Sequence, residues 1–243
     1  MDSGASAVFA RPPIPGRPKG VLLSAARVRA LLPGLLRNPA LWYVLSLAVA
    51  GVVEHTISTN RLQRLMDWCS TNLTNIRPAG HPVEAFVASA FIPQESAGVW
   101  PFFALSLFSV VAVLGARKAV VLLAGVHVGV SVVTEGLVWW RIHHGSLPAS
   151  EAHAWDTGPS YLVVAALTIA IGCTRPLWLR LVWALALAGA APSLLEGIGH
   201  GDYTAIGHVL SFSVGLVVVF YVRRTHSAST AMAEPATVPA THH

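Results

Sequence analysis

The stretch that decides the fold is residues 203–222, YTAIGHVLSFSVGLVVVFYV. It contains no Asp, Glu, Lys or Arg, and it has the length of about 20 residues that an α-helix needs to cross a bilayer core. One histidine, His208, lies within it. Ionisable residues are costly inside a membrane and tend to be functional there. The stretch therefore predicts a membrane-spanning helix that carries a candidate functional residue.

The composition of the whole chain extends this interpretation. Of 243 residues, 54% are hydrophobic and 11% are charged, and the mean hydropathy is +0.60. Soluble domains are about 25% charged. The apolar stretches are continuous, whereas a transmembrane barrel needs alternating segments of about ten residues. We therefore predict an all-α, polytopic membrane protein, in which the net charge of +5 belongs to loops and tails and does not indicate nucleic-acid binding.

Six spans follow from the apolar stretches, with approximate bounds Ala40–Ile57, Val99–Gly115, Ala119–Val138, Pro159–Cys173, Leu177–Leu195 and Tyr203–Val222. The fourth is the shortest, at roughly 22 Å for a rise of 1.5 Å per residue. Its outer end should lie below the membrane surface, and Ser160 is at that end.

Orientation follows from the basic residues, which are enriched in cytoplasmic loops. With the N-terminus inside, the outer side holds only Arg61, Arg64, Arg77 and Arg141. The inner side holds the larger set: Arg11, Arg17, Lys19, Arg27, Arg29, Arg37, Arg117, Lys118, Arg175, Arg180, Arg223 and Arg224. We therefore expect both termini in the cytoplasm.

The domain organisation follows from these spans. We expect a cytoplasmic N-terminal segment at 1–38, a membrane domain at 39–223 and a disordered cytoplasmic tail at 224–243. Residues 21–36 mix apolar positions with arginines and predict a helix lying on the inner leaflet. The first outer loop, residues 58–98, is long and apolar, and it should lie in the outer interface as short helices. No cofactor motif occurs, and the two cysteines should lie too far apart to form a disulfide.

Two polar residues combine into a candidate catalytic pair. Ser160 and His208 lie in spans that enter from the same side at similar depth. A serine hydroxyl needs a base to act as a nucleophile, and histidine is the usual one. Pro159 suits the first turn of a helix, so the free N–H groups of that turn would surround Ser160 and could hold an oxyanion.

A packing signal supports the pairing of these two spans. Gly207, Ser211 and Gly215 recur every four residues along the sixth span, and small residues let helices approach closely. The fourth span also offers small residues. The alternative interpretations are that Ser160 merely caps a helix and that the small residues only pack.

The two motifs, Gly158-Pro159-Ser160 and His208 with Ser211 and Gly215, resemble those of the rhomboid family of intramembrane serine proteases. In topology the resemblance covers residues 40–222. It implies a six-helix rhomboid-like bundle with a long membrane-associated first loop, a Ser160 nucleophile and a His208 base. It also implies transmembrane protein substrates within the lipid bilayer and, with the Ala-, Val- and Arg-rich composition, location in a bacterial inner membrane.

The chain departs from the family pattern at two places. Tyr161 stands where the motif has glycine, and the second span lacks the histidine and asparagine that help to hold the oxyanion in the family; it offers Trp100, Ser106 and Ser109. An oxyanion hole would then come from backbone N–H groups near Ser160 and Gly158, with Asn72 or Asn75 of the first loop. A catalytically inactive rhomboid-like protein that binds transmembrane partners is the alternative.

A metal-dependent membrane hydrolase is a further alternative. Glu54, Glu135 and Glu196 lie near the outer ends of the first, third and fifth spans. Nearby or along the spans are the further candidates His55, His127, His200 and Asp202. No His-Glu-x-x-His motif occurs on any span, so we predict no metal site. Asp156 is expected to form a turn or cap before Gly158, or to restrain the serine loop.

Overall fold

The computed structural model describes residues 25–93 and 99–233. The chain divides into two compact units, residues 1–35 and 36–243, which are treated separately. In the first unit, α1 (Ala25–Leu36) is a helix of 12 residues that contains Pro33. It covers most of the stretch expected to be helical at 21–36, and residues 21–24 lie outside the described part of the chain.

The second unit is built from α-helices and two short 3₁₀ segments, and residues 36–93 and 99–233 contain no strand. Its elements are α2 (Pro39–Thr56), α3 (Thr59–Cys69), α4 (Leu73–Ile76), α5 (Pro82–Ser89), α6 (Trp100–Ala104), α7 (Ser106–Leu114), α8 (Ala116–His143), η1 (Ala149–His153), α9 (Ser160–Cys173), α10 (Leu177–Leu194), η2 (Ile198–His200) and α11 (Tyr203–Ala233). Each predicted span is thus helical, and the all-α prediction is confirmed.

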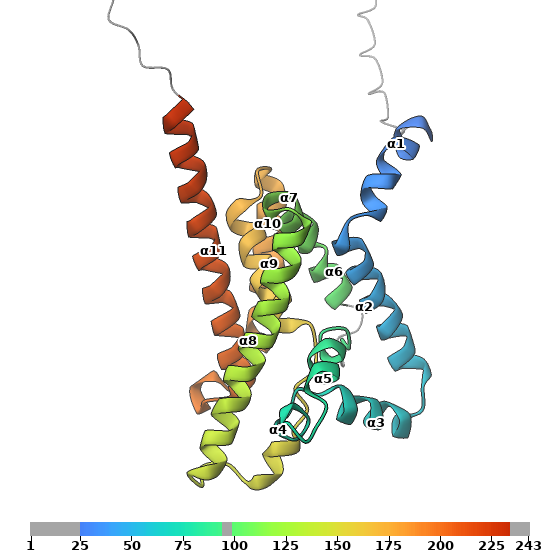
Figure 1. The fold of residues 1–243 in the computed structure, drawn as a ribbon, viewed down its shortest axis with the longest axis vertical. Coiled ribbons are helices and arrows are strands. Elements are labelled where there is room, and N and C mark those ends of the chain that lie inside the picture. Colours follow the sequence, from blue (N-terminus) through green and yellow to red (C-terminus); the bar gives the residue numbers. More distant parts are fainter. Residues whose placement is uncertain (1–24, 94–98, 234–243) are drawn as a thin grey trace, which may run out of the picture. The chain divides into compact units, whose positions relative to one another are not determined.

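The central element is α9, which packs against α7, α8, α10 and α11 (Figure 1). Its residues 161–170 are all buried. A helix that is apolar around its whole circumference has no face suited to water, so it is stable in the core of a bundle or in lipid, and burial places α9 in the core. With 14 residues, α9 is shorter than α8, α10 and α11, which pack around it.

Turn residues set where the helices begin and end. Asn38 caps α2 by accepting a hydrogen bond from the Ala40 N–H at 2.9 Å, and Pro39 occupies the first turn. Gly115 separates α7 from α8 with a φ of 80°, a conformation that glycine adopts at little cost. Pro176 precedes α10. Gly115 and Pro176 thus lie in the short turns that connect consecutive spans.

Several boundaries differ from the prediction. The second span is divided at Leu105 into α6 and α7, and α8 continues past Val138 to His143. The last helix, α11, extends to Ala233, past residue 224 where the tail was expected to begin. Its final stretch is rich in alanine and contains neither glycine nor proline before Pro235, so nothing in it opposes helix. Residues 234–243 lie outside the described chain.

The surface of the bundle is apolar. Large hydrophobic side chains are strongly exposed on several helices, including Val52, Leu185, Val217 and Phe220. Three helices, α8, α10 and α11 over Tyr203–Thr225, are long and apolar enough to cross a membrane, and Trp100–Leu114 and α9 are shorter apolar segments. An apolar surface of this kind is stable against lipid and unstable against water.

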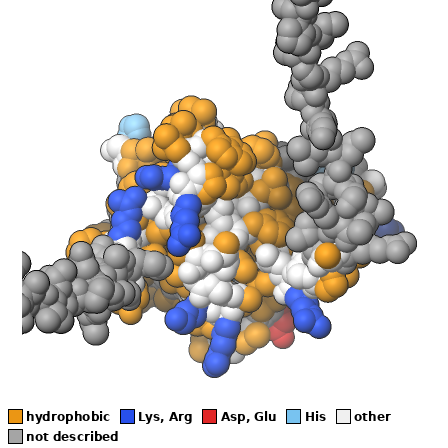
Figure 2. All heavy atoms as spheres, turned by 90° about the horizontal axis from the view of Figure 1, so that it is seen from above, with side chains coloured by type: hydrophobic (Ala, Val, Ile, Leu, Met, Phe, Trp, Pro, Cys, Tyr) orange, Lys and Arg blue, Asp and Glu red, His pale blue; other side chains and the backbone are white. Residues whose placement is uncertain are grey.

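Charge divides the bundle into two ends. The described Asp and Glu residues, from Glu54 to Asp202, lie toward the end where α8 finishes and α11 begins, and Glu135 is the one placed well inside a long helix. The opposite end carries Arg117, Lys118, Arg175, Arg180, Arg223 and Arg224. Figure 2 views this basic end and shows Lys and Arg side chains distributed around it.

Candidate functional site

The loop before α9 is held in place by a buried carboxylate. Asp156 accepts a hydrogen bond from the Thr71 hydroxyl at 3.0 Å and a long one from the Tyr161 hydroxyl at 3.4 Å. Its backbone N–H donates to Ser70 Oγ at 2.8 Å. Burial raises the pKa of the Asp156 carboxyl to about 6, and the negative charge of Asp202 adds to the increase while these two hydroxyls oppose it. Asp156 therefore joins the first loop to the start of α9.

Gly158 gives this loop its shape. Its φ is 119°, a conformation that residues with a Cβ rarely adopt. Its N–H donates to the Ser89 carbonyl at 2.9 Å, which ties the loop to the end of α5. Because this N–H already has an acceptor, Gly158 shapes the loop and does not present a free donor beside Ser160.

Ser160 is the first residue of α9 and is partly exposed. Pro159 occupies the cap position, and no side chain caps the helix, so the Ser160 hydroxyl does not serve as a cap. Within the described chain this hydroxyl makes no hydrogen bond. The first internal bond runs from the Val163 N–H to the Pro159 carbonyl, which leaves the N–H groups of Ser160, Tyr161 and Leu162 as the open donors of the first turn.

His208 lies on α11 and is buried, with one ring nitrogen engaged and one open. Nδ1 is 2.7 Å from the Leu194 carbonyl oxygen at the end of α10. A carbonyl can only accept, so Nδ1 carries the hydrogen and the lone pair of the neutral ring lies on Nε2. Nε2 is buried and has no hydrogen-bond partner among the described residues. The basic nitrogen is therefore uncommitted.

The ring of His208 lies against α9 at the residue after Ser160. The Tyr161 and His208 ring centroids are 5.4 Å apart, at an interplanar angle of 58°. The preceding residue, Gly207, permits this approach, because an added Cβ there would lie 2.5 Å from Tyr161 Cε1 and 2.9 Å from Thr134 Cγ2. The start of α9 and the first turns of α11 thus meet closely at Tyr161.

The contact between α9 and α11 continues along both helices. An added Cβ at Gly215 would lie 2.7 Å from Thr168 Cβ and 3.1 Å from the Ala165 carbonyl oxygen. Between these glycines Ser211 is fully buried and donates to the Gly207 carbonyl at 2.9 Å. The residues of α9 in this contact recur at helical spacing, and Ser160 precedes the first of them, Tyr161, by one residue, or about 100° around the helix.

The pair lies below the end of the bundle. Tyr161 meets Gly207 at the level of Thr134, which is nine residues before the end of α8 at His143. At 1.5 Å per residue this is about 14 Å along the helix axis. The short fourth span was predicted to begin deeper than the neighbouring spans, and α9 begins at a deeper level than the end of α8.

The structure records no hydrogen bond between the Ser160 hydroxyl and His208 Nε2 within the described chain. Nε2 is completely covered by neighbouring atoms. Catalytic hydrogen bonds are often long or absent before substrate binds. As the structure stands, Nε2 has no exposed surface through which another molecule could contact it.

The two asparagines named for the oxyanion hole have structural partners. Asn75 Nδ2 donates to the Asp67 and Ser70 carbonyls at 2.7 and 2.8 Å, which uses both of its hydrogens. Asn72 is buried and accepts from the Asn75 N–H through Oδ1, so it caps α4. Its Nδ2 makes one long contact of 3.5 Å with the His153 carbonyl. Asn72 thus retains one donor hydrogen, and Asn75 retains none.

The second predicted span contributes mainly to packing. Ser109 on α7 accepts a hydrogen bond from Trp183 Nε1 on α10 at 3.3 Å. Ser106 is fully buried, and its hydroxyl has no partner in the described residues. The amide or imidazole donor that the family pattern supplies from this span has no counterpart on α6 or α7.

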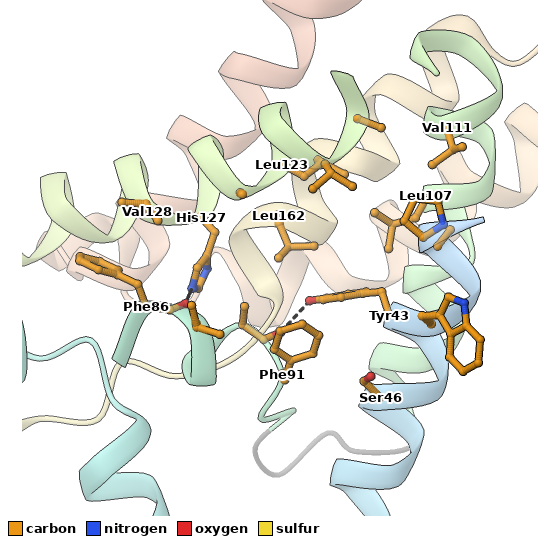
Figure 3. Close-up of a pocket in the computed structure, with 18 residues that line it drawn as sticks. Tyr43, Ser46, Phe86, Phe91, Leu107, Val111, Leu123, His127, Val128 and Leu162 are labelled. Carbon is orange, nitrogen blue, oxygen red and sulfur yellow. Dashed lines mark hydrogen bonds between the residues drawn. The ribbon is translucent and has the colours of Figure 1, made fainter. Parts of the chain in front are cut away.

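An apolar cavity of about 520 Å³ lies on the other side of α9, between α2, α5, α7 and α8 (Figure 3). Two polar side chains bound it and anchor the first loop. The Tyr43 hydroxyl donates to the Ala90 carbonyl at 2.6 Å. His127 Nε2 lies 3.1 Å from the Phe86 carbonyl oxygen and 2.9 Å from Ser89 Oγ. Since the carbonyl only accepts, Nε2 carries the hydrogen and anchors the ring to α5, and the lone pair lies on Nδ1, which is buried with no hydrogen-bond partner in the described residues.

The residues weighed as metal ligands are dispersed. In residues 25–93 and 99–233, no three His, Cys, Asp or Glu side chains gather closely enough to hold a metal ion. Glu135 is buried on α8, Glu196 is exposed, and Asp202 caps α11 by accepting from the Ala205 N–H at 2.8 Å. Cys69 and Cys173 are both free thiols.

The family model for rhomboid-like proteins matches residues 35–228. The chain belongs to the rhomboid-like family. This match covers all six predicted spans and confirms the resemblance drawn from the two short motifs. No curated protein and no solved structure matches the chain. The rhomboid-like family is all-α and polytopic, in agreement with the helices described above.

Sequence reasoning allowed that Asp156 restrains the serine loop, but it missed the contacts by which Asp156 and His127 fix the first loop of this rhomboid-like protein. The partner of Asp156, Thr71, lies 85 residues earlier in the chain. The sequence did contain a signal for His127. A single histidine on an otherwise apolar helix face needs a hydrogen-bond partner for its ring when it is buried. Its partners on α5 become visible only in three dimensions.

Proposed function

We propose that this rhomboid-like protein is an intramembrane serine protease in which Ser160 is the nucleophile and His208 the general base. The observation that carries the proposal is the state of the His208 ring. Its Nδ1–H is held by the Leu194 carbonyl, its Nε2 is buried and uncommitted, and its face lies against Tyr161, the residue that follows Ser160. A base held in one tautomer by a second group is the arrangement that nucleophilic catalysis requires.

The reaction proceeds in two stages. As the Ser160 oxygen bonds to the carbonyl carbon of the scissile peptide, His208 Nε2 takes the hydroxyl proton. The oxyanion accepts hydrogen bonds from the open N–H groups of the first turn of α9, aided by the positive end of the helix dipole. His208 then gives the proton to the leaving amine. Water, deprotonated by the same nitrogen, releases the acyl group and restores Ser160.

The substrates are single transmembrane segments rich in small residues near the end of the bundle where α9 begins. The separation of charge between the two ends supports an orientation with the basic end and both termini in the cytoplasm. The active residues would then open toward the non-cytoplasmic side. The bacterial inner membrane is the location that we propose.

The test is cleavage of a labelled single-span substrate by the purified full-length protein in liposomes. We expect Ser160→Ala and His208→Ala each to lower the rate by at least about a thousandfold. The matched control is Ser213→Ala, an exposed serine on α11 that donates to the Val209 carbonyl, and it should retain the wild-type rate. Cleavage that persists in Ser160→Ala would contradict the proposal.

A catalytically silent protein that binds transmembrane segments is the second candidate. The observation in its favour is the shortage of oxyanion donors, because the Gly158 N–H and both Asn75 amide hydrogens have other acceptors. Absence of cleavage by the wild type, with equal crosslinking of the same substrate segment to wild type and Ser160→Ala, would favour this candidate. Chelator-sensitive cleavage that survives Ser160→Ala would instead favour a metal hydrolase.

A further inference from the structure

A second cleft lies at the basic end of the bundle, opposite to Ser160. It has a volume of about 1090 Å³ and is formed where α9 ends and α10 begins, between α7 and the last turns of α11. Its walls combine two kinds of residue. Apolar side chains of Phe108, Ala112, Val113 and Leu179 line one part, and Arg175, Arg180 and Arg223 line the other.

Two of the arginines are held in place by the end of α9. Arg180 Nε donates to the Ile171 carbonyl at 2.7 Å. Arg223 donates to the Gly172 carbonyl through Nε and Nη2, at 3.1 and 2.8 Å. These carbonyls belong to the last turn of the helix, where they lack partners within it and where a cation is favoured. The guanidinium groups are therefore fixed at the edge of the cleft.

The hydrogen bonds that hold these arginines in place do not neutralise their positive charge. Backbone carbonyls are neutral, so the two arginines remain fully charged after they bind. Arg175, in the turn between α9 and α10, is exposed and makes no hydrogen bond within the described residues. The described carboxylates lie toward the other end of the bundle. The lining of the cleft thus contains three arginines and, in the described part of the chain, no acidic residue.

We propose that this cleft binds one anionic phospholipid from the adjoining leaflet. The headgroup phosphate would meet Arg175, Arg180 and Arg223, since guanidinium groups bind phosphate through paired N–H donors. One acyl chain would lie along Phe108, Ala112 and Leu179. Basic pockets between transmembrane helices on the cytoplasmic side suit such headgroups. The apolar wall favours a lipid over free phosphate, which has no apolar part to bury.

The proposal is independent of catalysis, because the cleft contains neither Ser160 nor His208. The test is native mass spectrometry of the full-length protein released from bilayers that contain equal amounts of phosphatidylglycerol and phosphatidylcholine. We expect the wild type to retain one phosphatidylglycerol in preference to phosphatidylcholine by about fivefold or more. Equal retention of the two lipids would overturn the proposal, and this comparison requires no variant.

Variants localise the effect. Arg175→Gln removes a charge without removing a helix cap, and it should lower phosphatidylglycerol retention about fivefold. The matched control is Arg117→Gln, which makes the same change at the same end on α8 but outside the cleft, and it should stay within about twofold of wild type. Equal losses in the two variants would indicate a diffuse surface effect and contradict the site.

A third variant separates a lipid from a free anion. Ala112→Trp leaves every arginine in place and fills the apolar wall, so it should lower lipid retention. Millimolar inorganic phosphate should leave the bound lipid in place. If phosphate displaces the lipid, or if Ala112→Trp retains phosphatidylglycerol as the wild type does, the cleft binds a phosphate group alone and the lipid proposal is wrong.

Discussion

In the proposed mechanism, one hydrogen bond prepares the His208 ring for proton transfer. The Leu194 carbonyl accepts the Nδ1–H, and this bond fixes both the tautomer and the orientation of the ring, so Nε2 is the basic nitrogen. A carbonyl fulfils here the orienting role that a carboxylate fulfils in many triads, but it adds no negative charge to stabilise the imidazolium. The proposed catalytic group is therefore a Ser–His dyad, because the group that orients the histidine carries no charge.

Asp156 gives a prediction about pH. Its carboxyl has a raised pKa of about 6 when folded and an ordinary value of 3.8, so the folded protein favours the protonated form. Its contribution to stability is fully present below about pH 4 and is lost as the pH rises through about 6, by roughly 2–3 kcal/mol. We expect Asp156→Asn to remove this slope, as measured by unfolding in mixed micelles between pH 4 and 7.

The control for Asp156 is Glu84→Gln, which changes an exposed carboxyl on α5 and should leave the slope as in the wild type. A slope unchanged in Asp156→Asn would mean that another buried acid, such as Glu135, causes it. Both carboxyls are buried near the start of α9, and sequence alone gave no reason to prefer either, because their burial depends on how the first loop folds over α8.

The contact between α9 and α11 depends on glycine at position 207. Alanine there would bring its Cβ to 2.5 Å from the Tyr161 ring and 2.9 Å from Thr134, so the helices would have to separate. We expect Gly207→Ala to cost about 1–3 kcal/mol of stability and to lower activity, because His208 moves with the helix. Unfolding in sodium dodecyl sulfate and substrate cleavage are the measurements.

Gly129→Ala on α8 is the matched control for this change. No atom lies within 4 Å of an added Cβ at Gly129, so the substitution should be neutral or should stabilise the helix by up to about 1 kcal/mol. If the two glycine variants are equally stable, the close approach of α9 and α11 is not real.

The first loop depends on anchors to the bundle. Tyr43→Phe keeps the ring and removes the hydrogen bond to the Ala90 carbonyl, which should loosen α5 by about 1–3 kcal/mol. The exposed Arg61, Arg64 and Arg77 should then be cut faster by trypsin. Tyr221→Phe, an exposed tyrosine on α11, should leave the cleavage rate unchanged. Equal cleavage rates in all three proteins would show that the Tyr43 bond does not restrain the loop.

Hydropathy predicted the elements well because helix length and apolar composition are local properties. All six spans correspond to helices, and the short fourth span agrees with the 14-residue α9. The division of the second span at Leu105 and the extension of α11 to Ala233 were not predicted. These boundaries depend on helix packing and capping more than on composition. A prediction of spans from hydropathy takes account of neither packing nor capping.

The site was less predictable than the fold. Two short motifs singled out Ser160 and His208, and the structure brings their neighbourhoods together at Tyr161. The partners that bind the loop, Thr71, Ser70 and Ser89, come from a segment some 70–90 residues away in sequence. Nothing in the spacing of these polar residues indicates such contacts, because they follow only from the way the first loop folds.

The bundle as a whole separates its charges, which predicts its orientation. In a background with Cys69→Ser and Cys173→Ser, single cysteines at Lys118 and Arg175 should resist a membrane-impermeant thiol reagent in intact cells. Cysteines at Ser146 and Gly199, at the other end of the bundle, should react. Permeabilised cells provide the control, in which all four should react. The reverse pattern would invert the topology and place Ser160 on the cytoplasmic side.

The proposed dyad has one direct test, the covalent labelling of Ser160. The full-length protein in detergent is treated with a fluorophosphonate, and the modified peptide is identified by mass spectrometry. The account predicts a label on Ser160 that disappears in Ser160→Ala, falls to background in His208→Ala and persists in Ser213→Ala. A label that remains in Ser160→Ala, or that forms on Ser160 equally well without His208, would contradict it.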